Sequence, residues 1–286
     1  MSEPMRFGYL PVAREIRGEC VVVESLPDLA TRVTAVQNAV TKIDRWLYAD
    51  SSSPLVRVPA THSLSLTEPG VEGRRDTEFL VFVLGLMEGL HLIPEDWAHL
   101  YRAPTSCGTL NDCVCSPAEL GPVLDRTQRR WVGWSVKARK VAYGALFWLL
   151  SCRAYHYEFE RFTGLYMVLD ALYQLHQLGG GRKAPKHGER AQVMCTEYDV
   201  PVPAWARSDG STSALAQIRN ELFHEARYGG VPLGHAKPST PPHLVLEVAG
   251  LCSRLMFALL NVDCKYVHTS AEFGTGARVG FELGMP

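Results

Sequence analysis

Hydrophobic positions in the C-terminal half of the chain recur every three or four residues, which is the spacing of one face of an α-helix. The clearest series lies between residues 155 and 175, where two apolar stripes run side by side. Its members are Tyr155, Phe159, Phe162, Tyr166, Leu169 and Tyr173 in one stripe, and Leu165, Val168, Leu172 and Leu175 in the other. An apolar face this wide is typical of a helix inside a bundle.

Other segments of this half show the same period. They predict helices near residues 130–152, 189–198, 213–228 and 245–259. In the helix at 213–228, the buried stripe consists of Leu215, Ile218, Leu222 and Ala226. Near the end, extended stretches at 266–269 and 278–283 predict a terminal hairpin. The C-terminal part is therefore expected to be an all-α bundle with a possible hairpin after it.

The N-terminal half has a mixed pattern. Short apolar stretches predict strands at residues 7–12, 20–23, 55–58 and 62–66, and helical spacing predicts helices at 29–47 and 78–92. Asp76 or Thr77 is expected to cap the second helix, and Pro94 to stop it. The stretch 107–122 is rich in Gly, Pro and Ser and predicts a loop at a domain boundary. We therefore expect an α+β chain, with a smaller mixed α/β domain at residues 1–125 and the helical bundle at 126–286.

Composition narrows the class of protein. The chain has 286 residues, of which 47% are hydrophobic, so it has enough apolar surface for two packed domains and does not read as disordered. Its longest apolar runs, 79–86 and 141–150, are too short to span a bilayer, and the first ten residues lack the apolar core of a secretory signal. A cytoplasmic protein without membrane contact is expected. The eight cysteines lack the Cys-x-x-Cys spacing of zinc sites, so neither metal nor cofactor is predicted.

Charge is unevenly distributed along the chain. Residues 1–124 carry 10 Lys and Arg against 16 Asp and Glu, a net charge of −6, whereas residues 125–286 carry 19 against 14, a net charge of +5. Two basic runs lie in the second part. They are Arg126, Arg129, Arg130, Lys137, Arg139 and Lys140, and then Arg182, Lys183, Lys186 and Arg190 beside His187. Each run is either a contact surface for a phosphate backbone or an ordinary solvated helix face or loop.

The helix predicted at 213–228 carries Arg219, Asn220 and His224. Arginine offers a charged fork that matches phosphate oxygens, and histidine is the side chain best suited to proton transfer near neutral pH. At 100° per residue, Asn220 and His224 are neighbours that point away from the buried stripe, together with Arg227 and Tyr228. Arg219 is five residues before His224, so only a long side chain that curls back brings the two together. The alternative is a solvated helix face with an unrelated arginine and histidine.

A helical bundle whose late helix carries Arg-Asn-x-x-x-His resembles the HEPN family, in particular its RNase-type members. The resemblance covers roughly residues 130–265, and Asp170 matches an acidic position in an earlier helix of that family. It implies a metal-independent endoribonuclease that forms a homodimer, with two copies of the motif facing each other across the bundle. Such RNases often act as toxins or antiviral effectors, which the resemblance suggests for this chain.

The resemblance also implies a mechanism and roles for individual residues. The RNA 2′-hydroxyl attacks the neighbouring phosphate and leaves a 2′,3′-cyclic phosphate. His224 moves the proton, Arg219 binds the developing charge, and Asn220 orients the phosphate or His224. Asp170 either holds Arg219 in place or is a plain surface carboxylate. The residues expected to contact RNA are Arg227, Tyr228, Arg182, Lys183, Lys186, Arg129 and Arg130.

Two other functions fit the same residues. One is a HEPN-like module that binds RNA or a nucleotide without cutting it, and the other is a structural dimerisation bundle in which the outer face of the motif helix is interface. The N-terminal domain is open to three roles: sensing a trigger, binding a regulatory partner, or restraining the nuclease. The pattern of residues 1–125 favours none of them.

Overall fold

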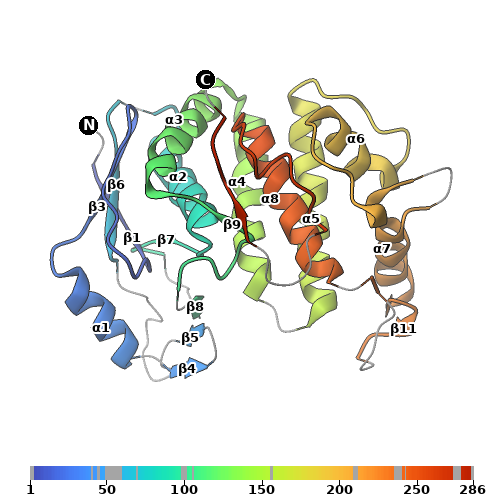
Figure 1. The fold of residues 1–286 in the computed structure, drawn as a ribbon, viewed down its shortest axis with the longest axis horizontal. Helices are drawn as coiled ribbons and strands as arrows, with labels where there is room; N and C mark the ends of the chain where they lie inside the picture. Colours follow the sequence, from blue (N-terminus) through green and yellow to red (C-terminus); the bar gives the residue numbers. More distant parts are fainter. Residues whose placement is uncertain are drawn as a thin grey trace. The chain divides into compact units, whose positions relative to one another are not determined.

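The computed structural model describes residues 3–39, 41–43, 46–48, 60–68, 70–97, 102–104, 106–154, 157–208, 212–234, 240–241, 243–272 and 278–284. Its contacts divide the chain into two compact units (Figure 1). The first comprises residues 1–134 and 280–283, and the second residues 135–279 and 284–286. Helices and small antiparallel sheets together make the chain α+β. The boundary expected at residue 125 falls inside helix α3 (Pro117–Gly133), which belongs to the first unit.

The first unit is built on a five-stranded antiparallel sheet in the order β2-β3-β6-β1-β7. Its strands are β1 (Met5–Gly8), β2 (Ile16–Arg17), β3 (Val21–Ser25), β6 (His62–Leu66) and β7 (Ile93–Pro94). Leu64 of β6 lies opposite Val23 of β3 on one side and Met5 of β1 on the other. Buried and partly buried residues alternate along β6, so one face of this strand belongs to the core. The strand predicted at 62–66 is confirmed.

Two helices cover the sheet on one side (Figure 1). Helix α2 (Arg74–Glu88) packs on β1 and β6, while α3 packs on α2, β2 and β3. From Asp76 to Glu88 every residue of α2 is buried, and its central part, residues 79–87, is apolar around the whole circumference, as expected for a buried helix. It begins earlier than predicted, after Gly73, and ends before Pro94 because Gly89 adopts a left-handed conformation, with φ of 64°.

Two predictions for the first unit are wrong. The helix expected at 29–47 is only α1 (Leu29–Ala39), and Thr41–Ile43 (β4) and Trp46–Tyr48 (β5) form a small sheet with Arg102–Pro104 (β8). β-branched residues at Thr41 and Ile43 favour the extended conformation locally. The loop expected at 107–122 contains strand β9 (Cys113–Val114) and the start of α3, where Ser116 and Glu119 form a capping box. The strand expected at 55–58 lies outside the described residues.

Two buried carboxylates hold the turns of the first unit. Asp125 on α3 accepts hydrogen bonds from the backbone N–H groups of Glu19 and Cys20, both at 2.8 Å, in the turn between β2 and β3. Asp76 on α2 accepts from the backbone N–H of Glu72 and from the indole of Trp131. Both buried carboxylates therefore have hydrogen-bond donors as partners, as buried polar groups require.

The second unit is helical, as predicted. Its helices are α4 (Val136–Ser151), α5 (Glu158–Leu178), α6 (Arg190–Glu197), α7 (Ala214–Glu225) and α8 (Leu244–Leu259). Helix α5 contacts the other four, and both of its predicted stripes are largely buried from Phe162 onward (Figure 1). Tyr155, the first member of one stripe, lies outside the described residues.

The predicted terminal hairpin is wrong. Residues 266–269 form a turn, and the buried Arg254 of α8 holds it by donating to the carbonyl oxygens of Thr269 and Ser270 and to the Tyr266 hydroxyl. Residues 280–283 return instead to the first unit, where the N–H of Phe281 donates to the carbonyl of Val114. Strand β12 (Val279–Gly280) accordingly pairs with β9.

Candidate functional site

Helix α7 positions the motif residues. Ser213 caps its N-terminus by accepting a hydrogen bond from the N–H of Ala216, and Leu215, Ala216 and Ile218 face the core. The helix ends at Glu225, three residues earlier than predicted, because Ala226 adopts a left-handed conformation with φ of 51°. The first two members of the predicted stripe are buried, whereas Leu222 is half-buried and Ala226 is exposed.

A hairpin follows the helix and changes the expected position of Tyr228. Strand β10 (Arg227–Tyr228) pairs with β11 (Val231–Pro232) across Gly229 and Gly230, both of which have positive φ. Tyr228 is consequently buried and packs edge-on against Phe162 of α5, so the prediction that it points outward with His224 is wrong. Arg227 pairs with Glu225 at 2.8 Å and remains partly exposed. The Gly-Gly pair was the sequence signal for this turn.

Asn220 and His224 each contact Arg219 on the exposed side of α7. Arg219 Nη1 donates to Asn220 Oδ1 at 3.0 Å and lies 3.0 Å from His224 Nε2. The arginine side chain thus curls back along the helix, as its length allows. Because a guanidinium can only donate, Nε2 of His224 is the acceptor, and this contact requires the neutral imidazole with its proton on Nδ1. The arrangement places a cation, an amide and a proton acceptor within one helical turn.

Arg219 is also positioned by an aromatic ring. Its guanidinium carbon lies 5.3 Å from the ring centre of Phe223, one turn further along α7. The Nε–H group of Arg219 is buried and has no hydrogen-bond partner among the described residues. An unsatisfied buried donor is costly, so a ligand oxygen that lets the guanidinium turn would relieve this cost. The side chain is held, but its hydrogen-bonding capacity is not used up.

A second polar cluster lies beside the motif, on α5 and the start of α6. The Tyr166 hydroxyl is 3.0 Å from His187 Nδ1, and His187 Nε2 is 3.3 Å from Asp170. Arg190 donates to the other oxygen of Asp170 at 3.0 Å. Tyr166 joins this cluster to the motif, since its ring contacts that of Phe223 at 6.4 Å.

Burial is the main cause that raises the pKa of the Tyr166 phenol, so this hydroxyl stays protonated at neutral pH. The negative charge of Asp170 raises it further, while the positive charges of Arg219 and Arg190 lower it. All three charges are therefore close enough to act on the same phenol.

Asp170 does not hold Arg219, contrary to the first of its two predicted roles. Its contacts are Arg190 and His187, and about a third of its side chain is exposed. Asp170 was predicted as an acidic residue of the long helix, and it lies on α5. Its partners His187 and Arg190 follow it by 17 and 20 residues, and no pattern in the sequence pairs them with it. Tyr166, His187 and Arg190 were not among the predicted site residues.

The other residues expected to contact RNA fall into two groups. Arg182, Lys183 and Lys186 are exposed on a loop whose backbone is anchored to α5 by His176, Gln177 and the Tyr173 hydroxyl. Arg129 and Arg130 lie on α3 in the first unit, where Arg129 pairs with Glu19 and Arg130 packs over Trp134. The loop cations therefore share a unit with the motif, and the α3 cations do not.

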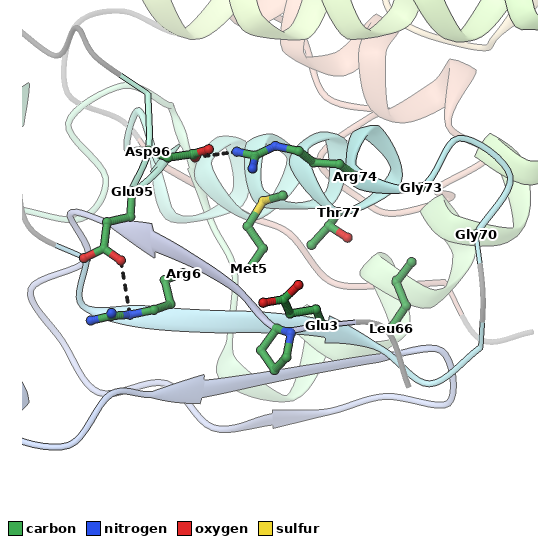
Figure 2. A pocket seen from close by; sticks show the side chains of 11 residues that line it. Glu3, Met5, Arg6, Leu66, Gly70, Gly73, Arg74, Thr77, Glu95 and Asp96 are labelled. Carbon is green, nitrogen blue, oxygen red and sulfur yellow. Dashed lines mark hydrogen bonds and ion pairs between the residues drawn. The ribbon is translucent and has the colours of Figure 1, made fainter.

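The first unit contains a cavity of about 650 Å³, which is in the size range of small-molecule sites (Figure 2). It lies between the start of β1, the end of β6 and the first turn of α2. Figure 2 shows the two arginines that line it, each already paired: Arg6 with Glu95 at 3.2 Å, and Arg74 with Asp96. No lining arginine is left for an anionic ligand. The cavity therefore does not share the chemistry of the motif on α7.

Comparison of the chain with protein-family models, with curated proteins and with solved structures found no match. Within the described part of the chain, no helix is long and apolar enough to cross a membrane. Nor do any three His, Cys, Asp or Glu side chains of the described residues gather as potential metal ligands.

Proposed function

We propose that the second unit is a metal-independent endoribonuclease of the HEPN type, with Arg219 and His224 as its catalytic pair. The observation that carries the proposal is the 3.0 Å contact between Arg219 Nη1 and His224 Nε2 on the exposed side of α7. Attack of a 2′-hydroxyl on a phosphate requires a cation that binds the phosphate and a group that accepts the hydroxyl proton. Arg219 and His224 are groups of these two kinds, and they are accessible and in contact. Asn220 adds an amide that holds the arginine in the same place.

In this mechanism the substrate phosphate replaces His224 as the acceptor for Arg219. Release of Nε2 leaves His224 free to take the proton from the RNA 2′-hydroxyl. The 2′-oxygen then bonds to phosphorus, the bond from phosphorus to the 5′-oxygen breaks, and the departing oxygen takes a proton from solvent. Arg219 stabilises the charge that develops on the phosphate oxygens. The products are a 2′,3′-cyclic phosphate and a 5′-hydroxyl.

The proposal includes RNA and a second copy of the chain as partners, and a role as a toxin or antiviral effector. The dimer and the biological role rest on the resemblance alone. The exposed cations of the loop that contains Lys183 and Lys186 support RNA binding, because cations that neutralise phosphates release counterions from the nucleic acid. A trigger acting through the first unit belongs to the same proposal.

The test is cleavage of a mixed RNA pool in the presence of a chelator, with mapping of product ends. Wild type is expected to give 2′,3′-cyclic phosphate ends, and His224→Ala is expected to lose at least about 100-fold in rate. His268→Ala is a matched control, since His268 is also a partly exposed histidine of the second unit. Equal cleavage by wild type and His224→Ala would contradict the mechanism. Salt-dependent binding without cleavage by wild type would favour the non-catalytic binding module instead.

A further inference from the structure

Phe223 is an apolar side chain placed where a folded domain usually has a polar one. It lies on α7 between Arg219 and His224, and 46% of it is exposed. Helical residues at such exposed positions gain little from packing, so a phenylalanine there is informative when polar, functional side chains surround it. The Arg219 guanidinium lies 5.3 Å from its ring centre, and this contact fixes where the nearest positive charge is.

The ring of Phe223 belongs to a short row of aromatic groups. Tyr166, which is almost fully buried, contacts Phe223 at 6.4 Å on one side and stacks on His187 at 5.8 Å with an angle of 20° between the planes. Behind it, Phe162 contacts the Tyr166 ring at 6.0 Å. The buried ring of Tyr166 therefore supports the rings of Phe223 and His187, and both of these are partly exposed to solvent. Rigid, partly exposed rings bind flat ligands at low entropic cost.

We propose that Phe223 is a stacking platform for one nucleobase of a single-stranded nucleic acid whose adjacent phosphate is bound by Arg219. The inference rests on the proposed function and adds a base-binding subsite to it. The ligand must present a flat aromatic face and an anionic group within a few ångströms of each other, because Phe223 and Arg219 are that close. Nucleotides meet this requirement. In a duplex the base faces are stacked on one another, so only an unpaired strand offers one to a protein ring.

The subsite is tested by binding to strands that cannot be cleaved. The probes are a fluorescein-labelled 2′-O-methyl oligouridylate, which lacks the nucleophilic hydroxyl, and the same backbone with abasic residues. Wild type is expected to bind the first probe more tightly than the second. Phe223→Ala is expected to weaken binding of the first probe about 10-fold to 100-fold and to weaken binding of the second much less, through the lost contact of the ring with Arg219. Phe223→Trp retains a ring and is expected to restore the preference, whereas Phe223→Leu is not.

Met167→Ala is the matched control, because Met167 is an equally exposed apolar residue on α5. Loss of base preference in this variant as well would overturn the proposal. So would an unchanged preference in Phe223→Ala, or the absence of wild-type binding to either probe. A shift of Phe223→Ala to a smaller oligomer in sedimentation, with base preference retained, would show that a second copy of the chain covers the ring.

The closing experiment separates this inference from the proposed function. Wild type and Phe223→Ala are compared in binding to the uncleavable probe and in cleavage of the matching RNA. If binding depends on the base and on Phe223 but wild type does not cleave RNA, the base-binding subsite is supported and the ribonuclease activity is contradicted. If wild type cleaves RNA and Phe223→Ala has the same KM and base preference, the ribonuclease activity is supported and the subsite is contradicted.

Discussion

Asp125 and Asp170 are both acidic residues on helices, yet the two units of the protein use them in opposite ways. Asp125 of the first unit is only 5% exposed, and its two oxygens accept backbone N–H groups of a single turn. Asp170 of the second unit has 36% of its side chain exposed and pairs with two side chains that are themselves partly exposed. The Asp125 carboxylate therefore serves to stabilise the fold, whereas Asp170 and its partners Arg190 and His187 remain accessible to a ligand.

A similar contrast separates His62 of the first unit from the two histidines near the motif, although His176 of the second unit is also buried. His62 of the first unit is buried between Ser25 and Thr61, and burial lowers its pKa to about 4. His224 and His187 of the second unit lie at the surface, in contact with charged or phenolic partners. Buried titratable groups make a fold sensitive to pH, and accessible ones are available for proton transfer. The predictions below test whether this division is real.

The largest expected effect is on the stability of the first unit. Asp125→Ala removes the charged acceptor of two partly buried backbone N–H groups and should lower the free energy of unfolding by about 2–4 kcal/mol. A side chain at Gly18 would also be excluded by this carboxylate, whose oxygen would lie 2.5 Å from an added Cβ. Urea titration of the full chain, with Asp170→Ala as the control, measures the difference. If both variants lose the same free energy of unfolding, the two carboxylates do not differ in their contribution to stability.

The next effect is the acid sensitivity of His62. An unfolded histidine titrates near pH 6.5, whereas the buried His62 resists protonation until its lowered pKa near 4. Between these values the unfolded chain binds a proton that the folded chain refuses, so stability is lost as pH falls through this window. The contribution of His62 reaches about 3 kcal/mol and should be missing from His62→Gln, whereas the buried His91, with a pKa also lowered to about 4, keeps its own contribution in both proteins. Unfolding curves of both proteins from pH 7 to pH 4 check it; parallel curves would show that His62 is not responsible.

A third effect concerns the motif and rests on the proposed function. Arg219→Lys keeps the positive charge but loses the planar guanidinium, whose Nη1 contacts both Asn220 and His224. Single-turnover RNA cleavage is expected to slow about 10-fold to 100-fold, while the free energy of unfolding changes by less than about 0.5 kcal/mol. A similar loss of stability and activity would instead give Arg219 a structural role.

The smallest expected effect is that of Asp170→Asn. Its two ion pairs are partly exposed, so their loss should lower the free energy of unfolding by at most about 1 kcal/mol. The measurement is the same urea titration, and Asp125→Asn is the matched change at the buried position. A greater loss for Asp170→Asn than for Asp125→Asn would invert the comparison.

Local pattern was sufficient for much of the second unit. The apolar period placed α5 and α8 with errors of a few residues at their ends, because a helix that packs on one side repeats every 3.6 residues whatever its neighbours are. The contact between Arg219 and His224 was also within reach, since both residues lie on one helix. Local signals were missed elsewhere: Ser116 and Glu119 formed a capping box in a stretch assigned to a loop, and Gly229 and Gly230 formed the turn of a hairpin whose first strand, Arg227–Tyr228, was assigned to the helix.

The helices of the second unit, its basic charge and the spacing of Arg219, Asn220 and His224 could thus be predicted from the order of the residues. The contacts of Asp170 with Arg190 and His187, and the link that Tyr166 makes to the motif helix, became visible only in the folded protein. These pairs depend on how α5, α6 and α7 pack together. Short-range periodicity records which face of a helix is buried, but not which side chain of another helix will meet it.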